Sequence, residues 1–126
     1  MKIRVYYDDT DAGGIVYHAN YLKFCERSRS ELFFQRGKSP AMNGGHFVVK
    51  HLEADYKRPA KLGDMLEVKH EIFGIKNTSL TLKQNIWLED IKLFEMISIL
   101  VFVVDGKPTK INEETKEFFG TVNQTV

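Results

Sequence analysis

The segment 8–21, DDTDAGGIVYHANY, gathers more residues able to do chemistry than any other part of the chain. It places the Asp11 carboxylate shortly before Gly13 and Gly14, ahead of a helical pattern that begins near His18. Glycine lets the backbone approach a ligand closely, and a helix start offers unpaired N–H groups and the positive end of the helix dipole. Together these features predict a site that polarises a carbonyl oxygen while Asp11 acts on the carbonyl carbon or on water.

The same segment also fits a purely structural role. Acidic loops that shape turns or cap helices are common, so the spacing alone gives the two interpretations equal weight. For Asp8 and Asp9 the structural interpretation is favoured. We expect these two residues to be exposed to solvent, to form turn hydrogen bonds, or to support the site from beside it.

A short strand and a long helix flank this segment and would position it. Residues 3–7 are rich in β-forming residues and predict the strand. Residues 18–36 predict the helix, and Gly37 is the expected C-terminal cap. The apolar face of the helix carries Tyr21, Cys25, Ser28 and Leu32, with Leu22 and Phe33 beside them.

The rest of the chain predicts an antiparallel sheet. Alternating or continuous apolar patterns cover residues 47–56, 66–72, 80–88 and 93–104. The last stretch becomes apolar on both faces, which indicates a central strand between the helix and a partner subunit. Asn112 would cap a short helix over 112–119. A long helix wrapped by a five- or six-stranded antiparallel sheet is an α+β fold, predicted here as a single domain over residues 1–126.

The bulk composition disfavours several classes of protein. The formal net charge is +1, whereas general nucleic-acid binders carry a strong basic excess. No apolar run approaches the roughly 20 residues of a membrane-spanning helix, and the N-terminus lacks the apolar stretch of a signal peptide. The single cysteine, Cys25, excludes an internal disulfide and is expected to be a buried small apolar residue. We therefore expect a cytoplasmic protein.

The four histidines do not form a metal-binding signature. His46 and His51 are an odd number of positions apart, so a regular strand would direct them to opposite faces. The sequence therefore predicts no metal site.

Two stretches resemble a known family. Residues 4–33, RVYYDDTDAGGIVYHANYLKFCERSRSELF, look like the N-terminal signature of the 4-hydroxybenzoyl-CoA thioesterase branch of the hotdog superfamily. Residues 47–64, FVVKHLEADYKRPAKLGD, resemble a strand of that family and the turn after it. Within the branch, the chain is most similar to the YbgC-type acyl-CoA thioesterases associated with the Tol-Pal system. The resemblance implies a hotdog fold and hydrolysis of an aliphatic acyl-CoA to the free acid and CoA.

The resemblance also implies roles for individual residues. Asp11 takes the position of the family's nucleophile or general base, and the sequence does not choose between these two roles. Tyr17 and His18 match the catalytic Tyr-His pair of the YbgC-type proteins, and the N–H that polarises the carbonyl falls near His18. The His18 side chain would assist the leaving thiolate, orient Asp11, or serve the structure alone. Gly13 and Gly14 match the family's glycine pair and are expected beside the substrate.

No cofactor is implied, because a thioester is already electrophilic and CoA is part of the substrate. CoA carries phosphates, so basic side chains are expected to bind it. Lys57, Arg58 and Lys61 are the candidates, and a solvated basic turn is the alternative for them.

The expected partners follow from the same resemblance. We expect a homo-oligomer, a dimer of dimers in which edge strands pair and the active sites lie at the dimer interface. Acyl carrier protein is a further expected partner. Two rival functions stay open: a hotdog hydratase or dehydratase, and a non-catalytic module that binds acyl-CoA or acyl carrier protein. The Asp11 glycine loop favours the thioesterase over the dehydratase.

Overall fold

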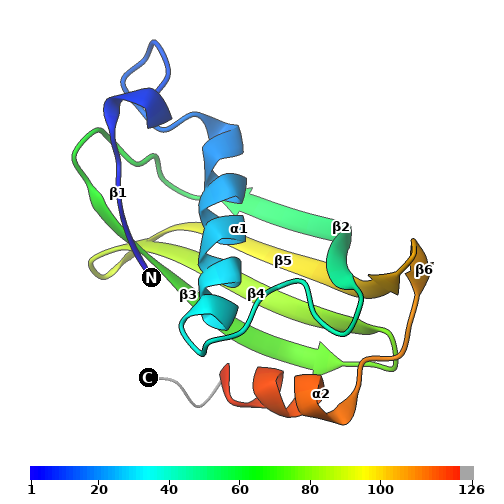
Figure 1. Cartoon of the computed structure of the whole chain (residues 1–126). Coiled ribbons are helices and arrows are strands. Elements are labelled where there is room, and N and C mark those ends of the chain that lie inside the picture. Colours follow the sequence, from blue (N-terminus) through cyan, green and yellow to red (C-terminus); the bar gives the residue numbers. More distant parts are fainter. Residues whose placement is uncertain (123–126) are drawn as a thin grey trace.

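The computed structural model describes residues 1–122. Figure 1 shows a curved sheet with one long helix lying across one of its faces. Within the described residues, the antiparallel sheet has six strands in the order β1-β3-β4-β5-β2, and β6 pairs with β5 outside this path. The predicted α+β architecture is therefore confirmed. The elements are β1 (Lys2–Arg4), η1 (Tyr7–Asp9), α1 (His18–Phe34), β2 (His46–Tyr56), β3 (Met65–Ile75), β4 (Ser79–Leu88), β5 (Ile91–Val104), β6 (Lys107–Pro108) and α2 (Glu113–Gly120).

Helix α1 packs on the sheet through two apolar clusters. One cluster holds the first half of the helix in place and includes Tyr21, Phe24 and Cys25. Phe24 is buried although the predicted apolar face omitted it. The other cluster joins the end of α1 to α2, where the ring of Phe33 lies 5.6 Å from that of Phe119. The first cluster fixes the end of the helix at which the predicted site begins.

The C-terminal end of α1 confirms the glycine cap predicted from the sequence. Gly37 has a φ of +70°, in the left-handed region that glycine adopts without strain. The Gly37 N–H donates to the Phe34 carbonyl at 3.1 Å, and the Lys38 N–H donates to the Phe33 carbonyl at 2.9 Å. These two bonds form a Schellman motif, which satisfies carbonyls that the end of the helix would otherwise leave unpaired.

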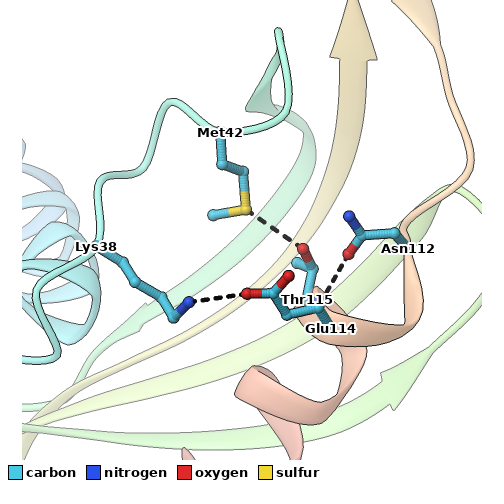
Figure 2. A network of polar contacts seen from close by, with 5 residues as sticks. All are labelled: Lys38, Met42, Asn112, Glu114 and Thr115. Carbon is cyan, nitrogen blue, oxygen red and sulfur yellow. Dashed lines mark hydrogen bonds and ion pairs between the residues drawn. The ribbon is translucent and has the colours of Figure 1, made fainter.

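A small polar network joins α2 to the segment after α1 (Figure 2). The Lys38 ammonium lies 3.2 Å from the Glu114 carboxylate, and the Thr115 hydroxyl donates to the Met42 sulfur at 3.4 Å. The Asn112 side chain accepts the Thr115 N–H at 2.8 Å, which confirms its predicted role as N-cap. These contacts belong to the end of α1 opposite the candidate site.

The first strand is shorter than predicted, because β1 ends at Arg4 and residues 7–9 form the short helix η1. The Tyr6 N–H donates to the Asp9 carboxylate at 2.9 Å, so a local turn takes a donor that a longer strand would have used for pairing.

The expectation for His46 and His51 is also corrected. The register of β2 against β5 shifts between Val49 and His51, so β2 contains a bulge. His46 pairs with Val103 and His51 pairs with Ile99. Because these two partners lie on the same face of β5, both histidines lie on the same face of the sheet.

Candidate active site

The loop 10–16 is closed by backbone contacts that hold Asp11 at its tip. Thr10 pairs with Val16, and the Asp11 N–H donates to the Ile15 carbonyl at 2.9 Å. The Gly13 N–H donates to Asp11 Oδ1 at 2.8 Å, and the Gly14 N–H donates to the Asp11 carbonyl at 3.0 Å. The second carboxylate oxygen of Asp11 has no hydrogen-bond partner within residues 1–122.

The two glycines allow this tight loop. Gly14 has a φ of +80°, which a residue with a side chain rarely adopts. A Cβ atom on Gly13 would lie 3.2 Å from Asp11 Oδ1, so a side chain there would crowd the carboxylate. The sequence pattern predicted the turn correctly, and the expected place of the two glycines beside a substrate stays a prediction.

Asp11 faces an open crevice of about 480 Å³. Tyr7 and Leu62 form parts of its wall, and Thr10, Ala12 and Gly14 complete the lining. The carboxylate is exposed, so a ligand in this crevice can reach it directly.

The start of α1 carries unpaired donors. Tyr17 is the N-cap, but its side chain makes no capping hydrogen bond. Among residues 1–122, the main-chain N–H groups of His18 and Ala19 donate no hydrogen bond. Adjacent free N–H groups at a helix N-terminus form a site that favours negative charge on an oxygen atom.

The Asp9 carbonyl anchors this helix start to the acidic loop. It accepts the Tyr17 N–H at 3.0 Å and the Asn20 side-chain amide at 2.9 Å. With its carboxylate bonded to the Tyr6 N–H, Asp9 has the turn-forming role predicted from the sequence. Asp8 is exposed, as expected.

Two tyrosines that were not among the predicted catalytic residues hold the same region. The Tyr56 hydroxyl donates to the His18 carbonyl at 2.8 Å. The Tyr21 hydroxyl accepts the Ala60 N–H at 2.9 Å, and the Ala60 carbonyl accepts the Val16 N–H at 2.9 Å. Tyr56 ends β2, far along the chain from His18. From the sequence it was expected to pack in the core or to line an acyl pocket, and this contact was not predicted.

His18 and Tyr17 form an aromatic pair at the helix start. Their ring centroids are 4.4 Å apart, and the Tyr56 ring lies edge-on to His18 at 6.5 Å. All three side chains are exposed. No hydrogen bond joins His18 to Asp11 in the described part of the chain. The predicted orientation of Asp11 by His18 therefore has no direct contact to support it within one subunit.

The three basic residues proposed for CoA have different surroundings. Lys61 lies beside the Asp11 loop, because its backbone pairs with Ile15. Lys57 points its ammonium to within 3.8 Å of Glu95, a carboxylate that also binds Lys83 at 2.6 Å. Arg58 is exposed. Of the three, Lys61 is the one whose backbone pairs with the Asp11 loop.

The remaining reactive side chains lie elsewhere. Cys25 is fully buried, and burial raises the pKa of its thiol to about 12, so it is not a nucleophile at neutral pH. Within residues 1–122, no three His, Cys, Asp or Glu side chains converge in a way that would hold a metal ion. No helix among the described residues is long and apolar enough to cross a membrane.

Comparison with known proteins gives consistent matches. The family model described as "Thioesterase superfamily" matches residues 13–95. The "Acyl-CoA thioesterase YbgC" of Helicobacter pylori is 41% identical over 116 residues, which cover 91% of this chain and 87% of that protein.

Two solved structures extend the comparison. A probable thioesterase from Bartonella henselae has a TM-score of 0.84 and 32% identity, over 89% of this chain and 97% of that one. A thioesterase from Thermus thermophilus, complexed with coenzyme A and Zn, also has a TM-score of 0.84, with 25% identity over 100% of this chain and 95% of that one.

Proposed function

Because the chain belongs to the thioesterase superfamily and has a hotdog fold, we propose that it hydrolyses acyl-CoA thioesters to a free acid and CoA. We propose that the reaction takes place at the Asp11 loop. The observation that carries the proposal is that Asp11 lines a crevice and has one carboxylate oxygen without a hydrogen-bond partner within residues 1–122. Its loop leads directly into the free N–H groups at the start of α1.

In the proposed reaction, the thioester carbonyl oxygen accepts hydrogen bonds from the free N–H groups of His18 and Ala19. These donors stabilise the negative charge that develops on the oxygen as the carbonyl carbon is attacked. Preorganised donors of this kind contribute about 10²- to 10³-fold to kcat in enzymes where one has been removed.

Asp11 acts in one of two ways. As a nucleophile, its free oxygen attacks the carbonyl carbon, CoA leaves as a thiolate, and water then hydrolyses the acyl-aspartyl anhydride to release the acid. As a general base, it takes a proton from a water molecule that attacks the carbonyl carbon directly. In either route the thiolate gains a proton, and we propose that the exposed His18 and Tyr17 side chains assist there.

We propose that the substrates are aliphatic acyl-CoAs. The helix-facing side of β2 carries Val49 and Leu52, which are 46% and 39% exposed although they are apolar. Burying an aliphatic chain against such side chains is favourable by about 0.8 kcal/mol per CH₂ group. Gly13 and Gly14 would lie beside the thioester, and Lys61 and Arg58 would bind CoA phosphates, with Lys57 available if it leaves Glu95.

We further propose that the active unit is a homo-oligomer. Strand β2 is an outer strand of the sheet, and it is 11 residues long. An unpaired edge of this length is a template for pairing with another strand. Pairing β2 with β2 of a second copy would also cover Val49 and Leu52, and two such dimers would form the predicted tetramer. We keep acyl carrier protein as a further proposed partner.

The test of the proposed function is the variant Asp11→Asn, which nearly preserves the shape of the side chain but removes the carboxylate. Thiol release from a panel of acyl-CoAs of increasing chain length should fall by at least about 10²-fold. Asp8→Asn is the matched control, because Asp8 is exposed and its replacement removes the same charge from the same region of the chain.

If a well-folded Asp11→Asn protein kept full turnover, the Asp11 carboxylate would have no role in the reaction. A wild-type protein that binds acyl-CoA but releases no thiol would instead be a binding module. Loss of the enoyl-thioester absorbance without thiol release would indicate a hydratase.

A further inference from the structure

Tyr56 makes a contact that the proposed chemistry does not yet use. Its hydroxyl donates to the main-chain carbonyl of His18 at 2.8 Å, a length typical of a well-formed hydrogen bond from a hydroxyl group. His18 is the first residue of α1, and Tyr56 is the last residue of β2. The bond therefore joins the sheet to the N-terminal end of the helix, where the free N–H groups lie.

The His18 carbonyl and the Ala19 N–H belong to the same peptide group. A hydrogen bond accepted by the carbonyl of a peptide polarises that peptide and makes its N–H a better donor, by about 10–30% of the strength of one bond. The carbonyl oxygen has two lone pairs, so it can accept from Tyr56 in addition to its bond within the helix. The Ala19 N–H has no acceptor within residues 1–122 and is available to a ligand.

The Tyr56 ring is held by other aromatic side chains. It packs against Phe94 at 5.0 Å and against Tyr21 at 5.4 Å, both in edge-on arrangements. Phe94 and Tyr21 are themselves buried in the core. The hydroxyl is therefore directed by a fixed ring although half of Tyr56 is exposed. Partial burial also raises the pKa of Tyr56, so its phenol remains a hydrogen-bond donor throughout the neutral pH range.

We propose that Tyr56 is a positioning residue for thioester hydrolysis, and that its hydroxyl fixes and polarises the His18–Ala19 peptide group, whose N–H receives the thioester carbonyl oxygen. This inference rests on the proposed function. It assigns a role in turnover to a residue of the sheet that does not itself touch the reacting atoms. The effect belongs to the transition state, because the charge on the carbonyl oxygen is largest there.

The first test is Tyr56→Phe, which removes only the hydroxyl group. We expect kcat to fall about two- to eightfold, which is about 10–30% of the free energy lost when a direct oxyanion donor is removed, with KM within about twofold of the wild-type value. The melting temperature and the elution volume on size exclusion should not change. Tyr6→Phe is the matched control, because Tyr6 is an exposed tyrosine whose hydroxyl makes no hydrogen bond within the described chain, and it should keep the wild-type kcat.

A second measurement distinguishes polarisation of the His18–Ala19 peptide group by the Tyr56 hydroxyl from a purely structural role of Tyr56. Replacing Tyr56 with fluorinated tyrosines lowers the pKa of the phenol, which strengthens its donation until it ionises. We expect kcat to rise with fluorination at low pH and to fall as the phenol loses its proton at higher pH, giving a pH profile that the wild-type enzyme lacks. In the amide NMR spectrum, the Ala19 proton should move upfield in Tyr56→Phe.

The outcomes distinguish this inference from the proposed function. If the wild-type protein releases no thiol, the proposed function fails and the catalytic role of Tyr56 fails with it. If the wild-type protein is active and Asp11→Asn is not, but Tyr56→Phe keeps kcat within twofold, only the role of Tyr56 is overturned. A loss of kcat accompanied by a lower melting temperature and an unchanged fluorotyrosine profile also overturns it, in favour of a structural role.

Discussion

Asp9 and Asp11 are close in the chain, but their carboxylates have different roles. Asp9 uses its carboxylate and its carbonyl to bond the backbone before and after it, so both groups are committed to the shape of the loop. Asp11 accepts a single N–H through its carboxylate and lines the crevice, and its other carboxylate oxygen has no hydrogen-bond partner within residues 1–122. The division follows from position, because only Asp11 is followed by the glycines that open space around it.

His70 offers a prediction on pH. It is mostly buried, and its Nε2 lies 3.1 Å from the hydroxyl of Ser28 on α1. Burial lowers the pKa of His70 from 6.5 to about 4, and the positive charges of the N-terminal ammonium and Arg29 add to the effect. Between these values the unfolded chain binds a proton that the folded protein does not.

The folded protein should therefore lose stability as the pH falls from about 6.5 to about 4, by up to about 1.4 kcal/mol per pH unit from this residue. Urea unfolding at pH 7, 5.5 and 4.5 measures the loss. His70→Gln cannot titrate but can still bond Ser28, so its stability should change less over the same range. An identical pH dependence in both proteins would contradict the assignment.

At the scale of elements, the start of α1 is defined by its neighbours more than by its own cap. Tyr17 supplies no capping side chain, and the helix begins where the Asp9 carbonyl, Tyr21 and Tyr56 fix it. Leaving the first N–H groups without a side-chain acceptor costs some helix stability. The same lack of a capping side chain makes those groups available to a substrate oxygen.

The second helix has a conventional cap and gives a prediction on stability. Asn112→Ala removes the acceptor of the Thr115 N–H and should cost about 1 kcal/mol, or about 4 °C in melting temperature for a domain of this size. Asn112→Asp retains an acceptor and should stay close to the wild type. Because α2 lies at the opposite end of α1, turnover at low temperature should be unchanged in both variants. An equal loss of stability in both would show that the cap bond is not the cause.

At the scale of the whole molecule, the outer edge of β2 has no partner strand within the described part of one subunit. The bulge at Val49–His51 changes which residues of β2 face the helix, and it leaves Val49 and Leu52 on that side. Both are apolar and exposed. A second copy paired along this edge would cover them and bring additional side chains toward the crevice.

Placing charge on this edge should therefore separate the subunits. The double variant Val49→Lys, Leu52→Lys should elute as a monomer. Its turnover should also fall, because the same two residues are proposed to bind the acyl chain, so the oligomeric state is the diagnostic measurement. Phe73→Lys introduces a charge of the same kind at a residue that is 52% exposed on β3, which β4 and β5 separate from β2, so β2 pairing should persist. Light scattering coupled to size exclusion measures the oligomeric state of each variant. A wild-type monomer, or a double variant that remains oligomeric, would contradict the proposed edge pairing.

The sequence by itself determined much of this protein. The periodicity of residues 18–36 and of the later strands predicted the α+β architecture to within a few residues, and Gly37 and Asn112 marked two helix ends correctly. The glycines after Asp11 predicted a tight loop ahead of a helix. These features depend on local backbone preferences, which a short run of consecutive residues is enough to set.

The tertiary structure determined the strand register and the contacts between residues far apart in the chain, which local sequence patterns do not show. Only the register of β2 against β5 showed the bulge that places His46 and His51 on one face. Only the packed fold brought Tyr56 to the His18 carbonyl and Ala60 to Tyr21. It also separated Lys57, paired with Glu95, from Lys61, which lies beside the Asp11 loop. The physical reason is that such contacts join residues far apart in the chain, so they depend on how whole elements pack and not on the preferences of any one segment.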